Sequence, residues 1–265
     1  MNILVCINSK FKHYMSVMLN SLSDNNKEED IKVFCLNSSL TEEDKNEIRA
    51  NNKNEKLEIN FIDIDPKLFA NAPTVKRYPQ EIYYRLLAYK YLPKDVDRIL
   101  YMVVDLIVKG SLKELYNKDF DGNLILATTN IGKFLNWFNR VRLGVKKGHI
   151  YLNSGVMMMN IKEMRNVFDE EKIYDFIRRK KRVMALYDED VLFALYGDRI
   201  GLIDSTIYNL SDRQIRKYNR HHKQKIDYQW VVENNKIIHY LGKNKPWKDD
   251  YKGILKPFYD KYNIK

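Results

Sequence analysis

Short apolar runs and longer helical patterns alternate along the first part of the chain. Residues 3–7, 31–36 and 57–64 are apolar over lengths that are typical of strands. Residues 11–22 and 42–52 lie between these runs and carry apolar side chains at helical spacing. The order strand, helix, strand, helix, strand predicts a parallel sheet with right-handed crossovers.

A longer apolar run follows a helical segment that is expected at residues 80–91. Residues 98–108 are apolar almost throughout, as in a strand buried on both faces, and Asp105 interrupts them. Ligands of open α/β sheets bind outside the carboxyl ends of strands, which makes Asp105 a candidate for chemistry. An aspartate that only caps a turn is the alternative interpretation, and it would be preferred if Asp105 stood alone.

The second half of the chain is less regular. We expect a strand at residues 150–160, a helix at residues 163–180 and a shorter helix at residues 188–196. After residue 200 the pattern breaks into short basic and aromatic segments. The sequence has no internal repeat and no linker rich in proline, glycine or serine, so we expect a single α/β domain with a C-terminal appendage.

The formal net charge of +11 over 265 residues is compatible with three kinds of binding partner: nucleic acid, an anionic membrane surface or a small phosphorylated substrate. Basic residues are dense at 178–182, where the helical pattern indicates a solvated face, and at 213–225, which we expect to be a basic loop. The glycine patterns of dinucleotide-binding and P-loop proteins are absent. The sequence also lacks the motifs of nucleic-acid-binding modules, so nucleic acid is not an expected partner.

The expected location is the cytoplasm. The N-terminus lacks the features of a secretory signal, and no apolar run is long enough to span a bilayer. Cys6 and Cys35 lie in strand-like runs, which favours buried structural thiols over redox or metal roles. Residues 247–265 are aromatic and basic. They suit either a peripheral contact with the inner membrane face or a packed C-terminal segment.

Four segments of the chain, taken in order, carry a resemblance to a known family. They are Tyr83-Tyr84-Arg85-Leu86, Tyr101 to Asp105, Leu152-Asn153-Ser154-Gly155-Val156 and His239-x-x-Gly242-x-x-Lys245-Pro246-Trp247, with Asp188-x-Asp190 between the last two. Over residues 2–255 the chain resembles the retaining glycosyltransferases of family 8, which include lipopolysaccharide galactosyltransferases and glycogenin.

This resemblance implies an α/β fold of the GT-A type. Such a fold has a mostly parallel central sheet flanked by helices, here with a smaller C-terminal appendage. The resemblance further implies one nucleotide-sugar-binding catalytic domain at residues 1–255 and a C-terminal tail at residues 256–265.

The resemblance also implies an activity. The expected reaction transfers a hexose from UDP-glucose or UDP-galactose, with retention, to a hydroxyl acceptor on a glycan, a lipid-linked sugar or a glycoprotein. A non-catalytic relative that binds nucleotide sugars or glycans is the alternative.

A divalent cation is part of the expected site, because a sugar nucleotide presents a negatively charged diphosphate. The resemblance implies that Asp105 and His239 hold Mn²⁺ or Mg²⁺. It further implies that Lys245 contacts the diphosphate as a point charge and that Gly242 lets the backbone approach the phosphates.

The metal-binding motif departs from the family pattern. Relatives carry Asp-x-Asp where this chain reads Val103-Val104-Asp105. Because Val103 offers no ligand atom, we expect weaker cation binding. The protein is then either an impaired or inactive relative, or one in which Val103 was introduced deliberately.

Further residues are assigned through the same resemblance. Asp188, Glu189 and Asn153 occupy catalytic positions, with Asp188 resembling an acceptor for a hydroxyl of the donor sugar and Glu189 replacing a frequent glutamine. Arg85 and Asn153 resemble positions that face the diphosphate and the donor sugar. Asn130 resembles another donor-sugar position.

Two further groups of residues have alternative interpretations. Asn8 resembles a residue that pairs with the uracil edge, although an asparagine at a strand end also commonly starts a turn. Phe134, Trp137 and Phe138 suit either an acceptor groove or a core-facing helix stripe.

Overall fold

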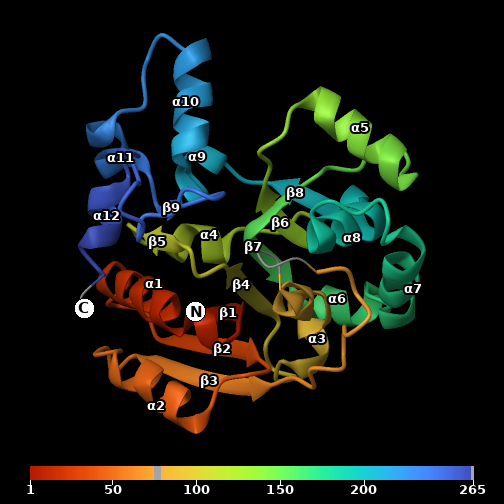
Figure 1. Cartoon of the computed structure of the whole chain (residues 1–265), viewed down its shortest axis with the longest axis horizontal. Coiled ribbons are helices and arrows are strands. Elements are labelled where there is room, and N and C mark those ends of the chain that lie inside the picture. The colour runs from red at the N-terminus through yellow and green to blue at the C-terminus, as the bar shows by residue number, and fades with distance from the viewer. Residues whose placement is uncertain (75–78, 264–265) are drawn as a thin grey trace.

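The computed structural model describes residues 1–74 and 79–263, and its helices cover both faces of a central sheet (Figure 1). The strands are β1 Asn2–Ile7, β2 Ile31–Asn37, β3 Leu57–Asp63, β4 Arg98–Met102, β5 Leu106–Val108, β6 Ile125–Thr128, β7 Asn153–Asn160, β8 Ile200–Leu202 and β9 Ile237–His239. The α-helices are α1 Lys12–Asp24, α2 Glu42–Ala50, α3 Ala88–Tyr91, α4 Lys113–Asn117, α5 Lys133–Leu143, α6 Ile161–Val167, α7 Glu170–Lys180, α8 Tyr187–Tyr196, α9 Ser205–Tyr208, α10 Asp212–His221, α11 Tyr228–Asn234 and α12 Lys256–Asp260. Short 3-10 segments are η1 Ser9–Phe11, η2 Gln80–Leu87 and η3 Gly197–Arg199.

The main sheet has seven strands in the order β3-β2-β1-β4-β7-β6-β8. All its neighbouring pairs are parallel except those of β7, which runs antiparallel to both β4 and β6. The expected α/β architecture with a mostly parallel, helix-flanked sheet is confirmed. Strands β2 and β3 extend the sheet on one side of β1 and β4 extends it on the other. The strand order therefore reverses at β1 and β4, which is where ligands bind in such sheets.

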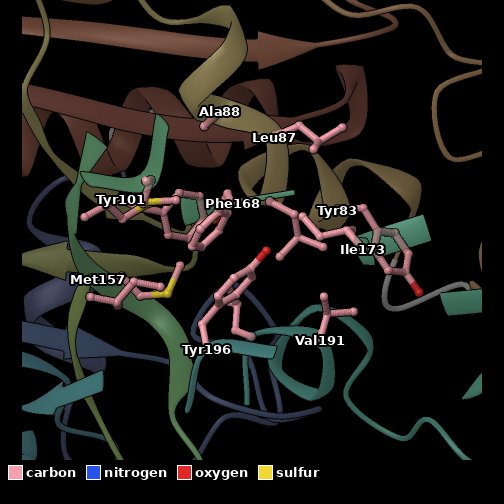
Figure 2. Packing of buried hydrophobic residues seen from close by; sticks show 14 of the residues in the cluster. Tyr83, Leu87, Ala88, Tyr101, Met157, Phe168, Ile173, Val191 and Tyr196 are labelled. Atoms are coloured by element: carbon pink, nitrogen blue, oxygen red, sulfur yellow. The ribbon is translucent and has the colours of Figure 1, made fainter. Parts of the chain in front are cut away.

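Successive side chains of the central strands point to opposite faces of the sheet, so the core is divided into two layers. Ile99 and Tyr101 of β4 face the layer formed with η2, α3, α6, α7 and α8, whereas Leu100 and Met102 face the layer formed with α1, α2 and α4. Figure 2 shows the first layer, in which Tyr101 and Met157 from the sheet pack near Phe168 and Tyr196. These layers hold β1, β4 and β7 in place beneath the site.

The single strand expected at residues 98–108 is wrong. The chain leaves the main sheet after Met102 and enters a separate two-stranded sheet, β5-β9, at Leu106. A continuous apolar run cannot distinguish one long strand from two short strands that are buried in different sheets. Asp105, the candidate for chemistry, therefore lies in the connection between the two sheets and not within a strand.

Two helix expectations and one loop expectation also need correction. Residues 163–180 are two helices, since α6 ends at Val167 and Asp169 caps α7 by accepting a hydrogen bond from the backbone of Lys172. Most of residues 80–91 form the 3-10 segment η2 rather than an α-helix. Much of the expected basic loop at 213–225 belongs to α10, which a capping box between Ser211 and Gln214 initiates.

The C-terminal segment packs against the domain. Leu255 and Tyr259 are buried in a cluster with residues of β5, β9, α10 and α11, and Trp247 stacks on Tyr14 with ring centroids 3.9 Å apart. The structure therefore favours the packed interpretation of residues 247–263, whereas residues 264–265 of the expected tail lie outside the described residues. Within the described ranges no helix is long and apolar enough to cross a membrane.

Candidate active site

Asp105 and His239 meet at the junction between the two sheets. Leu106 pairs with His239 in the β5-β9 register, and the backbone oxygen of Asp105 accepts a hydrogen bond from the N–H of Tyr240. This pairing brings Asp105 Oδ1 to 3.2 Å from His239 Nε2. Two residues that are far apart in the sequence are thereby adjacent, as the resemblance implied.

A buried asparagine orients the ring of His239. Asn209 is fully buried, and its Oδ1 lies 2.7 Å from His239 Nδ1. Asn209 Nδ2 donates to Thr128 Oγ1 at 2.6 Å and to Asn153 Oδ1 at 2.7 Å. Asn153 Oδ1 also accepts from the backbone N–H of Gly155, which fixes the orientation of that amide. The oxygen of Asn209 must then face His239, so Nδ1 carries a hydrogen and Nε2 points at Asp105.

Gly155 leaves the space that the imidazole occupies. A Cβ atom at residue 155 would lie 2.3 Å from His239 Cε1 and 2.6 Å from its Nδ1. Any larger residue would displace the ring. The backbone oxygen of Gly155 also accepts a hydrogen bond from the N–H of Val103, which ties the start of β7 to the end of β4.

Lys245 is the third residue at this junction. Its ammonium group forms an ion pair with Asp105 Oδ2 and donates to the backbone oxygen of Tyr240 at 2.8 Å. Burial opposes ionisation of Asp105, but the charges of Lys245 and His239 outweigh it and hold the pKa of that carboxyl well below its usual range. Gly242, in the same loop, has a φ of 94°, a conformation that favours glycine.

The fit of a divalent cation can be judged from these side chains. Asp105 and His239 offer the oxygen and nitrogen ligands that Mn²⁺ accepts, whereas half-buried Val103 and buried Val104 offer none. Within residues 1–74 and 79–263, no group of three His, Cys, Asp or Glu side chains is placed to hold a metal ion. The pair therefore fits a cation only if diphosphate oxygens complete its coordination, which is a common arrangement for Mg²⁺ at phosphate sites.

A second part of the site joins η2 to α8. Arg85 is buried and donates to the backbone oxygen and the Oγ of Ser154, each at 3.1 Å, while its guanidinium lies over the ring of Tyr101. Asp188 Oδ2 lies 3.4 Å from the same guanidinium. In the described part of the chain, neither Arg85 Nε nor Asp188 Oδ2 has a hydrogen-bond partner. Unsatisfied buried polar atoms of this kind are suited to bind a polar ligand.

Glu189 is a buried carboxyl with a raised pKa. Its Oε1 accepts hydrogen bonds from the backbone N–H of Ser154 at 3.0 Å and from Asn153 Nδ2 at 3.1 Å. Burial, followed by the neighbouring charge of Asp188, raises the pKa of Glu189 to about 8. Burial also raises the pKa of Asp188, although the charge of Arg85 opposes that shift. The raised pKa favours the protonated form of Glu189 near neutral pH.

The structure joins most of the expected site residues in one hydrogen-bonded network. His239, Asn209, Asn153 and Glu189 form a continuous chain of contacts from β9 to α8. Asn130 instead accepts a hydrogen bond from Gln214 Nε2 at 2.7 Å and so contacts α10.

Asn8 takes part in a separate small cluster. Its Nδ2 donates to Glu81 at 3.2 Å, and Glu81 also accepts from Ser38. Asn8 Oδ1 accepts from the backbone of Lys10 and caps η1, as expected of an asparagine that starts a turn, and its pairing with the uracil edge stays a prediction. Glu81 and Arg85 lie on η2, which links this cluster to the rest of the site.

Sequence reasoning missed Asn209, Thr128 and Glu81. Asn209 and Thr128 are fully buried polar residues. Asn209 lies in the region after residue 200, where no periodicity identified an element, and Thr128 ends the unpredicted strand β6. Glu81 falls in the segment that was expected to be a helix, in which a carboxylate is usually solvated.

Comparisons with known proteins identify the family of the chain. The model of Glycosyl transferase family 8 matches residues 2–251. A lipopolysaccharide 1,2-glucosyltransferase of Escherichia coli is 25% identical, over 70% of this chain but only 55% of its own length. General stress protein A of Bacillus subtilis is 23% identical over 99% of this chain and 91% of its own.

Two solved structures have the same fold. Both are of LgtC: one is an active-site mutant, with a TM-score of 0.85 and 23% identity, and the other is a galactosyltransferase complex with donor and acceptor sugar analogues, with a TM-score of 0.84 and 24% identity. Each alignment covers 99% of this chain and 95% of the other. The fold and the site thus define a glycosyltransferase with a GT-A architecture. The chain belongs to glycosyltransferase family 8.

Proposed function

We propose that this protein transfers a hexosyl group from a UDP-sugar to a hydroxyl group of a glycan, a lipid-linked sugar or a glycoprotein, with retention of configuration. The convergence of Asp105, His239 and Lys245 carries the proposal. The relatives support it, because their names describe glucosyl and galactosyl transfer and a complex with donor and acceptor sugar analogues. The proposed catalytic domain comprises residues 1–255.

Lys245 and the Asp105–His239 pair serve the departing diphosphate. Charge on this leaving group increases as the glycosidic bond breaks, so a fixed ammonium group nearby lowers the barrier. Asp105 and His239 would hold a divalent cation, which when bound supplies Lewis-acid stabilisation of the same oxygens. Lys245 exchanges its contact with Asp105 for the diphosphate, and Gly242 lets the loop backbone approach the phosphates.

The donor sugar occupies the region beside α8. Asp188 Oδ2, which lacks a hydrogen-bond partner among the described residues, accepts a hydrogen bond from a sugar hydroxyl. Asn153 orients Glu189, and the protonated carboxyl of Glu189 has both a donor and an acceptor oxygen. In offering both a donor and an acceptor it resembles the glutamine that is frequent in relatives. Arg85 balances the charge of Asp188 and faces the diphosphate.

Val103 weakens this site. The position follows β4 and its backbone is fixed by Gly155, so the side chain lies near Asp105 in the chain but provides no ligand. We infer that cation affinity, and hence turnover, is lower than a second carboxylate would give. Protein that binds UDP-sugars without turning them over would correspond to the non-catalytic alternative.

Val103→Asp tests the proposal directly. The variant and the wild type are titrated with UDP in the presence and absence of Mn²⁺, and hydrolysis of UDP-glucose and UDP-galactose is measured for both. We expect Val103→Asp to bind UDP roughly tenfold or more tightly in Mn²⁺ and to hydrolyse the donor faster, because a ligand has been added.

Val103→Asn is the matched control, since it places a polar group of similar size at the same position without the charge. It should show a much smaller gain than Val103→Asp. A folded Val103→Asp protein without any gain in Mn²⁺-dependent binding or hydrolysis would refute the proposed role of this position. Failure of every variant to bind any UDP-sugar would refute the function itself.

A further inference from the structure

Helix α5 presents an apolar face to solvent. Phe134, Trp137, Phe138 and Val141 follow the spacing i, i+3, i+4 and i+7, so they lie on one side of the helix. They are 72%, 51%, 50% and 63% exposed, and the neighbouring Leu135 is 48% exposed. The core-facing alternative for these aromatic residues is therefore wrong. Helix α5 itself stands away from the main sheet, at the upper right of Figure 1.

Two polar side chains of α5, Asn136 and Arg142, are hydrogen-bonded to the body of the protein. Asn136 accepts from the backbone N–H of Tyr151 at 2.9 Å and donates to the backbone oxygen of His149 at 3.2 Å. Arg142 makes a two-point ion pair, at 2.6 and 2.9 Å, with the fully buried carboxylate of Asp190 on α8. These contacts fix the rotation of the helix. These contacts therefore hold the apolar face outward, whereas a usual surface helix turns its apolar face towards the core.

Basic residues flank this apolar face along the chain, with the charge of Arg142 paired to Asp190. Residues 131–149 contain five basic residues and no acidic one; the basic residues are Lys133, Arg140, Arg142, Lys146 and Lys147. The basic end of α7, residues 178–182, borders α5, because Arg142 donates to the backbone oxygen of Val183 and a Cβ atom at Gly144 would lie 3.5 Å from Lys180 Nζ. Val183 is itself 42% exposed.

We propose that the apolar face of α5 docks on an anionic lipid surface. Exposed phenylalanine and tryptophan side chains on a helix that lies flat insert at the boundary between headgroups and acyl chains, and flanking lysine and arginine residues attract anionic headgroups. The absence of acidic residues from 131–149 favours such a surface over a protein partner with mixed charges. The site of membrane contact is thus α5 rather than the packed C-terminal segment.

This docking places the active-site side of the molecule near the bilayer. Arg142 holds α5 to Asp190, which follows Asp188 and Glu189 directly in α8. If the proposed function holds, an acceptor presented at a membrane surface would meet the donor-sugar region with little diffusion. The docking itself depends only on α5 and its basic surroundings, so it can be tested separately from transfer activity.

Vesicle flotation of the whole chain tests the proposal. Three proteins are mixed with phosphatidylcholine vesicles and with vesicles that also contain phosphatidylglycerol. They are the wild type, the α5 variant Phe134→Ser/Trp137→Ser/Phe138→Ser and the control Tyr228→Ser/Val232→Ser. The control removes exposed apolar side chains from α11. Circular dichroism and thermal unfolding establish that each variant is folded.

Wild type and control should float with the anionic vesicles and lose binding as salt is added. The α5 variant should bind roughly tenfold or more weakly, because apolar contact and charge act together. Equal flotation of all three proteins, or equal binding to neutral and anionic vesicles, would overturn the proposal. So would self-association in sedimentation that only the α5 variant loses, without vesicle binding, because a second copy would then cover α5.

Discussion

Asn209 Oδ1 lies 2.7 Å from His239 Nδ1, and this contact determines which nitrogen of the histidine faces Asp105. The orientation follows from the hydrogen bonds on the other side of Asn209, where its amide group donates to Thr128 and Asn153. A residue without any predicted chemistry thus controls the geometry of the proposed metal ligand. We regard Asn209 as a positioning residue, because it acts through His239.

Replacing Asn209 by leucine should weaken Mn²⁺-dependent UDP binding by roughly 10- to 100-fold, as expected for loss of a group that orients a ligand. Stability should fall by about 1–3 kcal/mol, because buried polar partners lose their hydrogen bonds. Titration calorimetry and urea unfolding measure the two effects. Thr128→Val is the control, since it removes one hydrogen bond of Asn209, while the contact with Asn153 remains and keeps the oxygen of Asn209 facing His239. Similar losses of UDP binding in both variants would argue against a positioning role.

Glu189 should make the protein less stable as the pH rises. Its pKa is raised from 4.5 to about 8, so the folded protein binds this proton more tightly than the unfolded chain. The folded state therefore holds the extra proton between these two values. Stability decreases as pH rises across that window, and the loss is complete above about 8.

Glu189→Gln should reduce this decrease in stability and leave the part that belongs to Asp188, whose pKa is also raised by burial. Urea unfolding across the same pH range measures it. Glu43→Gln, at an exposed position on α2, should keep the wild-type profile. If Glu189→Gln and the wild type lose stability in parallel, Glu189 is ionised in the folded protein throughout the range and the assigned pKa is wrong.

Gly155→Ala should disturb the site through His239. The added methyl group would lie 2.3 Å from His239 Cε1, so the ring must move and its alignment with Asp105 is lost. We expect Mn²⁺-dependent UDP binding to fall by roughly tenfold or more. Gly132→Ala is a suitable control, because a Cβ atom at that glycine meets no atom within 4 Å. Unchanged metal dependence in a folded Gly155→Ala protein would show that the ring does not need its present position.

The main sheet was predictable because its first strands are short and separated by regular helical patterns. The division at residues 103–105 was not predictable, since β4 from Ile99 onward and β5 are apolar and only pairing with distant β9 separates them. Strands β6 and β8 were missed for a similar reason. They have four and three residues, too few for a periodic signal.

The site was predictable where a residue type stands in a spaced motif, as with Asp105, His239 and Lys245. Asn209 was not, because its role depends on contacts with residues 56 and 30 positions away in the sequence, Asn153 and His239. The outward rotation of α5 was also beyond sequence reasoning. Its apolar spacing is that of a core-facing helix, but the hydrogen bonds of Asn136 and Arg142 and the burial of Leu143 turn this apolar face outward.

Lys245→Met tests whether the ammonium group recognises phosphate. Lys245 now contacts Asp105 and the backbone oxygen of Tyr240, and the methionine side chain has a similar length but no charge. A charge-assisted hydrogen bond contributes about 1.5–3 kcal/mol, so UDP should bind roughly 10- to 100-fold more weakly. Uridine has no phosphate, and its binding should stay within about twofold of wild type.

Lys243→Met separates this local contact from a general effect of charge. Lys243 is exposed in the same loop, so its loss removes the same formal charge at a position that solvent screens. We expect its UDP affinity to change by less than about threefold at physiological salt. Calorimetric titrations of both variants with UDP and with uridine distinguish a local contact of Lys245 with phosphate from a general effect of charge. Equal weakening of UDP and uridine by Lys245→Met would mean that Lys245 supports the fold of the loop through Asp105 and Tyr240, and that the diphosphate is held elsewhere.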